Sequence, residues 1–112
     1  MDDRARRIGQ NEAIFRAVNE QIEELNDRFH AVNDCTLQVV CECGSIDCVE
    51  QLSLPIAAYE ETRADSALFV VKPGHEIPDV EEVVADRAPA YFVVRKRPGG
   101  PEELARETDP RS

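Results

Sequence analysis

Hydrophobic side chains recur every three or four positions through the first third of the chain. The set is Ile8, Phe15, Val18, Ile22, Leu25, Phe29 and Val32, with Asn11 at the one missing position of a heptad pattern. This pattern predicts an amphipathic helix over about residues 8–32. Asn19, Asn26 and Asn33 recur beside the apolar stripe, and we expect them on a solvated flank.

The predicted helix is long for the chain that contains it. At about 1.5 Å per residue it would extend roughly 37 Å, which is more than a domain of this size comfortably covers with its own core. Two interpretations follow. We favour a helix packed on a sheet, and the alternative is that part of the stripe contacts another chain, as in a homodimer.

The rest of the pattern predicts short strands and one short helix. β-branched residues and partial alternation favour a strand over residues 35–43, a second over 68–71, and a hairpin of 80–85 with 91–94 around a turn at 86–89. The valine spacing in 80–85 also fits a short helix, but we favour a strand. Ser53 as N-cap and Pro55 in the first turn predict a helix over residues 54–64.

The chain length indicates one domain. At 112 residues we expect an α+β fold, with the long N-terminal helix packed on a small, mainly antiparallel sheet. The closely spaced Cys41, Cys43 and Cys48 predict that the sheet carries a zinc knuckle at residues 41–48. The domain is predicted over residues 8–97, after a flexible N-terminus at 1–7. Because Gly99, Gly100 and Pro101 interrupt regular structure and little apolar content follows, residues 98–112 are predicted to be a disordered tail.

Charge limits the possible partners. The net charge is −10, and residues 42–90 carry 11 acidic against 3 basic side chains. Such a surface repels phosphate backbones, so we expect a protein partner with a basic surface and no nucleic acid. Glu20, Glu23 and Glu24 on the predicted helix are the candidate partner-binding residues.

The cellular compartment affects how the cysteines are interpreted. The first ten residues are charged, no apolar segment of a signal peptide follows, and no run approaches the length of a membrane helix, so we expect a cytoplasmic protein with no membrane partner. In a reducing compartment, cysteines are expected as thiols or metal ligands before disulfides.

Three of the four cysteines lie within eight residues, at Cys41, Cys43 and Cys48. Sulfur ligands favour zinc over magnesium or calcium, and a fourth ligand would close the tetrahedral shell of a structural site. We favour His75, which follows the Pro73-Gly74 turn, over His30, Asp47 or Glu76. Because the chain has only six aromatic residues and its core is correspondingly thin, one structural Zn²⁺ per chain would contribute to folding.

Cys35 is not expected to join these ligands. Six residues of straight strand place it roughly 20 Å from Cys41, whereas a sulfur ligand lies about 2.3 Å from zinc. We interpret it as a small apolar thiol at the start of the strand, with a reactive thiol as the alternative.

The sequence carries no motif of a known catalytic site. His75 and Glu76 are adjacent and Asp79 stands where a metalloprotease helix has its second histidine, so neither the protease nor the deaminase pattern fits. We therefore expect a binding or regulatory module and no enzyme. The alternatives are a thiol-redox sensor that releases zinc on oxidation and, third, a zinc hydrolase with an open coordination position.

Two motifs that follow the predicted Asn-Glu-rich helix resemble those of a known group of proteins. Cys41-Glu42-Cys43-Gly44 with Cys48, followed by Pro73-Gly74-His75-Glu76, resembles a group of small actinobacterial proteins of uncharacterised function. The resemblance spans roughly residues 6–96 and includes Asn11-Glu12, Phe15-Arg16, Val18-Asn19-Glu20, Ile22-Glu23-Glu24-Leu25, Tyr59-Glu60, Arg63 and Phe69. It implies an intracellular bacterial protein and fits His75 as a ligand, but it implies no activity.

Overall fold

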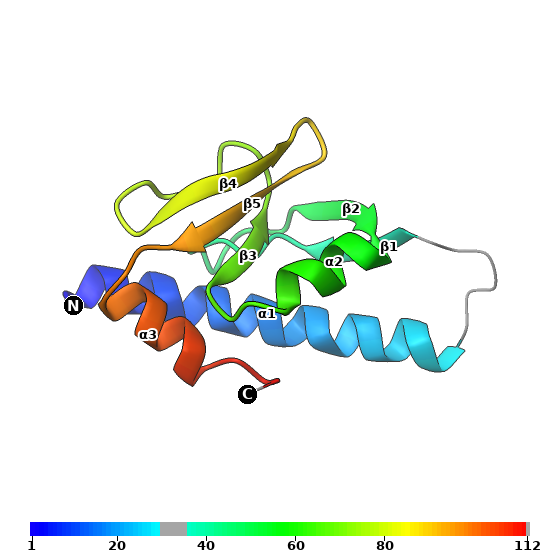
Figure 1. Ribbon diagram of the computed structural model, residues 1–112, viewed down its shortest axis with the longest axis horizontal. Helices are drawn as coiled ribbons and strands as arrows, with labels where there is room; N and C mark the ends of the chain where they lie inside the picture. Colours follow the sequence, from blue (N-terminus) through cyan, green and yellow to red (C-terminus); the bar gives the residue numbers. More distant parts are fainter. Residues whose placement is uncertain (30–35, 112) are drawn as a thin grey trace.

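The computed structural model describes residues 1–29 and 36–111, and the side chains of all of these except 26–29. The elements in chain order are α1 (Asp3–Phe29), β1 (Thr36–Val40), β2 (Gln51–Pro55), α2 (Ile56–Arg63), β3 (Leu68–Val71), β4 (Glu81–Arg87), β5 (Tyr91–Lys96) and α3 (Gly100–Glu107). The long helix α1 runs beneath the strands, and α3 lies beside it near its N-terminal half (Figure 1). The predicted α+β architecture is confirmed.

The strands form two small antiparallel sheets. β1 pairs with β2, so that Thr36 lies opposite Pro55, and β5 lies between β3 and β4 in the second sheet. The chain after β1 links the two sheets, because the Glu42 amide donates to the Val70 carbonyl of β3 at 2.8 Å. The cysteine segment therefore runs along the edge of the second sheet.

The predicted strands occur, although β1 ends at Val40 and not at Cys43, and β2 was not predicted. β3 matches residues 68–71, and the predicted hairpin is formed by β4 and β5, which shows residues 81–87 to be strand. The short helix begins later than predicted, because Ser53 and Leu54 pair with β1 and belong to β2. Pro55, with extended backbone, is the N-cap of α2 in place of Ser53.

The two ends of the chain differ from their prediction. α1 already begins at Asp3, and the segment expected to be a disordered tail contains α3. Pro101 and the acidic Glu102 in the first turn suit a helix start, and Leu104 is buried against α1. A Cβ at Gly9 would lie 2.5 Å from Leu104 Cδ2, so Gly9 lets α3 approach α1 closely. This tertiary contact accounts for a helix in a segment with few apolar residues.

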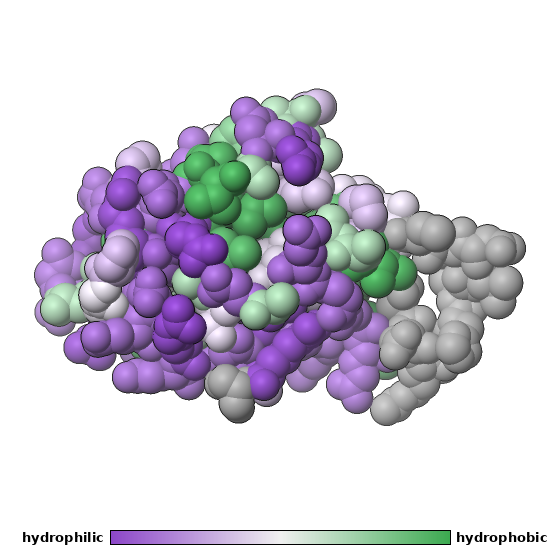
Figure 2. Space-filling model, in the orientation of Figure 1, coloured by the Kyte–Doolittle hydropathy of each residue, from purple (hydrophilic) through white to green (hydrophobic). Residues whose placement is uncertain are grey.

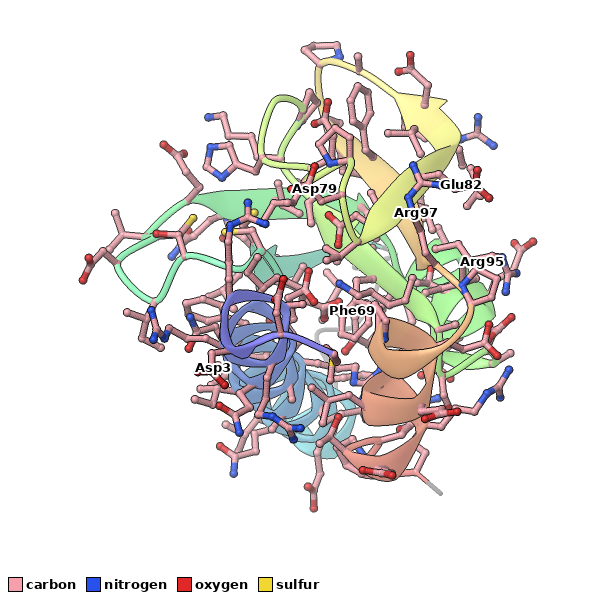
Figure 3. The ribbon with its side chains drawn as sticks, turned by 90° about the vertical axis from the view of Figure 1, so that its left-hand side faces the viewer. Asp3, Phe69, Asp79, Glu82, Arg95 and Arg97 are labelled. Carbon is pink, nitrogen blue, oxygen red and sulfur yellow. The ribbon has the colours of Figure 1, made fainter. Side chains whose placement is uncertain are left out.

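Two apolar clusters form the core. The first comprises Leu37, Val39, Leu52, Leu54, Tyr59, Val70, Tyr91 and Val93. The second comprises Cys41, Cys43, Phe69, Val71, Val94 and Ala105. Because neighbouring residues of β3 point to opposite faces, Val70 packs in the first cluster while Phe69 and Val71 pack in the second. Phe69 projects into the space between α1 and α3 (Figure 3).

α1 buries several polar side chains and exposes several apolar ones. The side chains of Glu12, Arg16 and Asn19 are all completely buried, whereas Ile14 is 51% and Val18 38% exposed. A surface helix normally shows the opposite arrangement.

This inversion corrects two predictions. Ile8 is buried, but Val18 and Leu25 of the predicted stripe are exposed, and Asn19 is in the interior and not on a solvated flank. Phe15 and Ile22 of the stripe are half-buried, and Ile22 packs against the core. Four further members of the two predicted sets lie outside the described side chains. These are Asn26, Phe29, Val32 and Asn33.

Other elements supply partners for most of the polar groups on this side of α1, although Glu12 Oε2 and Arg16 Nε have no hydrogen-bond partner among the described residues. The Arg16 guanidinium lies 4.4 Å from the centre of the Phe69 ring and donates to the carbonyls of Ser66 and Ala105, both at 2.7 Å. Lys96 of β5 bridges Glu12 at 2.6 Å and Glu81 at 3.0 Å. Paired and hydrogen-bonded charges of this kind can be buried, whereas unpaired ones cannot.

The surface is mainly hydrophilic on the face shown in Figure 2, with hydrophobic side chains gathered over β4 and β5. Val83 and Val84 of the edge strand β4 are 39% and 47% exposed. Among the described helices, none is both long and apolar enough to cross a membrane.

Candidate metal centre and acidic cavity

The segment that follows β1 places two cysteines on the same side of the chain. Alternation along the extended backbone places Cys41 and Cys43 on one face and Glu42 on the other, as predicted. The buried Glu42 carboxylate accepts hydrogen bonds from Asn19 Nδ2 at 2.8 Å and from the Val70 amide at 3.0 Å. Burial, partly offset by these hydrogen bonds, raises the pKa of Glu42 to about 7. The residue between the two cysteines thus anchors their backbone in the core.

A tight turn returns the chain to Cys48. The Cys48 amide donates to the Ser45 carbonyl at 3.1 Å, and Asn11 of α1 donates to the Gly44 carbonyl at 2.9 Å. Gly44 is required for space, because a Cβ there would lie 2.7 Å from Ile8 Cγ2 and 2.9 Å from Ile77 Cδ1. α1 therefore contacts the knuckle directly through Asn11. The sequence did not predict this contact.

The loop after β3 supplies the imidazole. Gly74 has φ of +98°, a conformation that favours glycine, and the His75 amide donates to the Lys72 carbonyl at 2.9 Å across this turn. The Lys72 amide donates to Cys41 Sγ at 3.2 Å, which fixes the loop to the knuckle. The turn aims His75 back at the cysteines.

The four predicted ligands converge. The ligand atoms of Cys41, Cys43, Cys48 and His75 all lie within 4.8 Å of one another, an arrangement that could hold a metal ion. His75 Nδ1 is 3.6 Å from both Cys41 Sγ and Cys48 Sγ. With zinc–sulfur bonds of about 2.3 Å and zinc–nitrogen bonds of about 2.0 Å, a regular tetrahedron requires sulfur–nitrogen separations of roughly 3.6 Å. The observed spacing fits one metal ion with Nδ1 as the nitrogen ligand.

The thiols influence one another's protonation. The hydrogen bond from Cys41 lowers the pKa of Cys43 to about 5, and the same bond, together with burial, raises the pKa of Cys41. Cys41 and Cys43 are buried, while Cys48 is half-buried. A thiolate stabilised by a neighbouring proton is the kind of site in which a metal ion can replace that proton.

The other candidate ligands are not part of this group. Asp47 is exposed, and Glu76 Oε1 accepts a hydrogen bond from the Gly74 amide at 2.8 Å. His30 and Cys35 lie outside the described residues, so the predicted role of Cys35 remains a prediction.

A second feature is an acidic cavity at the other end of α1. Its volume is about 850 Å³, and it is lined by Ala17, Glu20, Gln21, Glu23, Glu24, Ile56, Glu60, Pro110 and Arg111. All three candidate partner-binding residues therefore border one cavity. Glu60 of α2 and Arg111 were not predicted, because no local pattern connects α2 and the end of the chain to α1.

Arg111 is held by several carboxylates of this cavity. Its guanidinium donates to Glu20 and Glu60 at 2.9 Å and to Glu23 at 2.8 Å. Arg111 lowers the pKa of Glu60 to about 2, whereas burial and the neighbouring Glu60 raise the pKa of Glu23 to about 7. Arg63 also pairs with Glu20. The four carboxylates that line the cavity outnumber Arg111 and Arg63, so negative charge remains in excess there.

The fold and the donor set together define a small α+β domain with a cysteine-histidine group suited to one metal ion. Comparison of the chain with models of protein families, with curated proteins and with solved structures gave no match. The resemblance to small actinobacterial proteins therefore stays a prediction.

Proposed function

We propose that this is a small intracellular protein in which Cys41, Cys43, Cys48 and His75 hold one structural Zn²⁺. The observation that carries this proposal is the convergence of three sulfurs and one imidazole nitrogen within 4.8 Å. Sulfur and imidazole donors select zinc over the hard cations. The ion would tie the end of β1, the knuckle and the loop after β3 to one another.

Four protein ligands favour a structural over a catalytic metal. A catalytic zinc keeps an open position for water, whereas a closed shell of four protein ligands stabilises the fold. A zinc hydrolase is the less favoured proposal, because it requires one of the four converging residues to leave the metal.

Native mass spectrometry tests the metal. Protein purified without chelator should carry one zinc per chain, and His75→Ala should lower the affinity for zinc strongly. Asp47→Asn and Glu76→Gln are matched controls that should retain full occupancy, since both residues lie near the group without joining it. A metal-free wild-type chain, or equal zinc affinity of His75→Ala and wild type, would contradict the proposal.

We further propose that the acidic cavity binds a basic side chain of a protein partner. Arg111 supports this, because the cavity already accommodates a guanidinium through Glu20, Glu23 and Glu60. Planar guanidinium groups match carboxylates well, so arginine is the expected recognition residue of the partner. Arg111 would then compete with the partner's arginine for the carboxylates of the cavity.

Calorimetric titration with an arginine-containing peptide tests this second step. Arg111→Ala should bind the peptide more tightly than wild type, and Glu60→Gln in the same background should weaken binding again. Glu82→Gln, an exposed carboxylate on β4, is the matched control and should bind as tightly as its parent. Equal affinity of the Arg111→Ala protein with and without Glu60→Gln would refute this cavity as the binding site.

A thiol-redox sensor is the rival proposal, and the half-buried Cys48 supports it. Two thiolates would give two electrons to peroxide, form one disulfide and release the metal while peroxide is reduced to water. Zinc loss at low peroxide, reversed by a thiol reductant, is the expected result for a sensor. A purely structural metal should resist peroxide until the protein unfolds.

A further inference from the structure

The exposed face of α1 carries an uncharged stretch in a chain whose residues are 32% charged. Between Ile8 and Glu23 every exposed residue of α1 is neutral. These residues are Gln10, Ile14, Ala17, Val18 and Gln21. We call this set the neutral face.

Two larger apolar side chains dominate the neutral face, and a third continues it. Ile14 is 51%, Val18 38% and Leu25 50% exposed, and the spacing of four and seven residues keeps the three within roughly 40° of one another around the helix axis. In Figure 3, which looks along α1, the sheets and α3 cover the other sides of the helix. A surface helix normally turns such residues toward its own core.

The two ends of the neutral face carry opposite charges. Arg6 and Arg7 are exposed at its N-terminal end, and Glu24 is exposed at its C-terminal end. If two copies of α1 packed in parallel, like charges would meet at both ends. In an antiparallel pair, the basic end of each copy meets the acidic end of the other, which is favourable on both sides.

We propose that the neutral face of α1 binds the same face of a second copy of this chain, in an antiparallel, two-fold symmetric dimer. Charge complementarity fixes the register as well as the direction. The pairing that brings Arg7 level with Glu24 of the second copy also brings Ile14 level with Ala17 and Gln10 level with Gln21. A large side chain opposite a small one and an amide opposite an amide are compatible contacts. The same surface on both copies is what a two-fold interface requires.

The size of the contact predicts a weak dimer. A single pair of helices in contact over about five turns belongs to the small interfaces, below about 1,200 Å² in total, that form transient complexes. The dimer is therefore expected at high protein concentration and should dissociate on dilution.

Sedimentation velocity over a concentration series, from about 1 µM to 1 mM, tests the dimer. Wild type should shift from monomer to dimer, and Ile14→Glu should stay monomeric with an unchanged melting temperature because its side chain is exposed. Glu82→Gln on β4 is the control and should dimerise like wild type. A wild-type chain that stays monomeric throughout, or Ile14→Glu that dimerises as well as wild type, overturns the proposal.

Charge reversal tests direction. The double variant Arg6→Glu/Arg7→Glu and the single variant Glu24→Arg should each be monomeric, since like charges would meet at both ends. An equimolar mixture of the two should form a heterodimer, because each acidic end then meets a basic one. A parallel wild-type pair would already have like charges at both ends, so either variant dimerising as well as wild type overturns the antiparallel arrangement. Failure of the mixture to associate, with both variants folded by circular dichroism, overturns it too.

The dimer interface and the acidic cavity share part of α1, but Ile14 and Glu60 each belong to only one of them. Ala17, Gln21 and Glu24 border the acidic cavity, but Ile14 and Arg7 do not line it, and Glu60 lies on α2. Loss of dimer formation in Ile14→Glu and loss of peptide binding in Glu60→Gln therefore report on different surfaces.

Discussion

The side-chain amide of Asn19 pairs with both backbone groups of Val40. Nδ2 donates to the Val40 carbonyl and Oδ1 accepts from the Val40 amide, each at 2.8 Å. The amide of one helical residue thus acts as a strand neighbour for the end of β1, immediately before the cysteines. The same Nδ2 also donates to Glu42.

Asn19→Leu should therefore destabilise the protein by about 3 kcal/mol, since it leaves buried donors and acceptors without partners. Urea denaturation measures the change. The control is Gln21→Leu, at an exposed position two residues further along α1. It should change the free energy of unfolding by about 0.5 kcal/mol or less. A small effect of Asn19→Leu would show that water replaces the amide.

Arg16→Lys should behave as a disruptive substitution despite the conserved charge. The guanidinium donates to the carbonyls of Ser66 and Ala105 at the same time and stacks on Phe69. A lysine ammonium is a compact charge that lacks the planar group and the divergent N–H donors needed for these contacts. We expect a loss of about 2 kcal/mol in the free energy of unfolding. The exposed Arg7→Lys should be nearly neutral, and equal effects of the two would contradict this interpretation.

Lys96→Met should be among the most destabilising single substitutions. It leaves the carboxylates of Glu12 and Glu81 buried without their cation, at a cost of about 3–5 kcal/mol. Thermal unfolding at neutral pH measures it. A double variant that also carries Glu12→Gln should recover part of the loss, and no recovery would mean that Lys96 acts through packing alone.

Glu12→Gln gives a pH-dependent test of the same group. Burial, followed by the charge of Glu81, raises the pKa of Glu12 well above its ordinary value. A raised carboxyl pKa means that the folded state binds a proton more tightly than the unfolded state, so the contribution of Glu12 to stability falls as pH rises above the ordinary value of 4.5. The stability of Glu12→Gln relative to wild type should therefore increase with pH. A difference that does not vary with pH would contradict the raised pKa.

Asp109 should stabilise the protein against acid. Burial tends to raise its pKa, but hydrogen bonds from Ser66, the Arg111 amide and Arg63 outweigh burial and lower the pKa to about 2. A lowered carboxyl pKa contributes stability that is present above the ordinary value of 3.8 and is lost as pH falls toward 2. This contribution is on the order of 2 kcal/mol.

The measurement is the difference in unfolding free energy between wild type and Asp109→Asn, taken from pH 6 to pH 2. The difference should shrink toward low pH, and any effect of pH that both proteins share cancels in it. Asp79→Asn, whose carboxylate forms an exposed ion pair with Arg4, should show no such trend. A constant difference for Asp109→Asn would contradict the lowered pKa.

Local patterns were sufficient for β3, for the β4–β5 hairpin and for the four residues of the candidate metal group. The alternation through Cys41 and Cys43 and the turn before His75 depend on neighbouring residues only, so the sequence predicted four side chains that the fold then brings within 4.8 Å. The β3 strand and the β4–β5 hairpin were predicted for the same reason, because strand alternation and turn chemistry are short-range.

The environment of α1 and the end of the chain depended on tertiary contacts. Periodicity assumes that apolar residues face the core, yet Glu12, Arg16 and Asn19 do so here because β1, β5 and α3 provide partners from distant parts of the sequence. Likewise, α3 is a helix because Leu104 packs beside Gly9. The sequence by itself determined β3, the β4–β5 hairpin and the four residues of the candidate metal group. Only the tertiary structure decided that residues 100–107 form a helix and which face of α1 is buried, because buried charges are stable only where other elements supply partners for them.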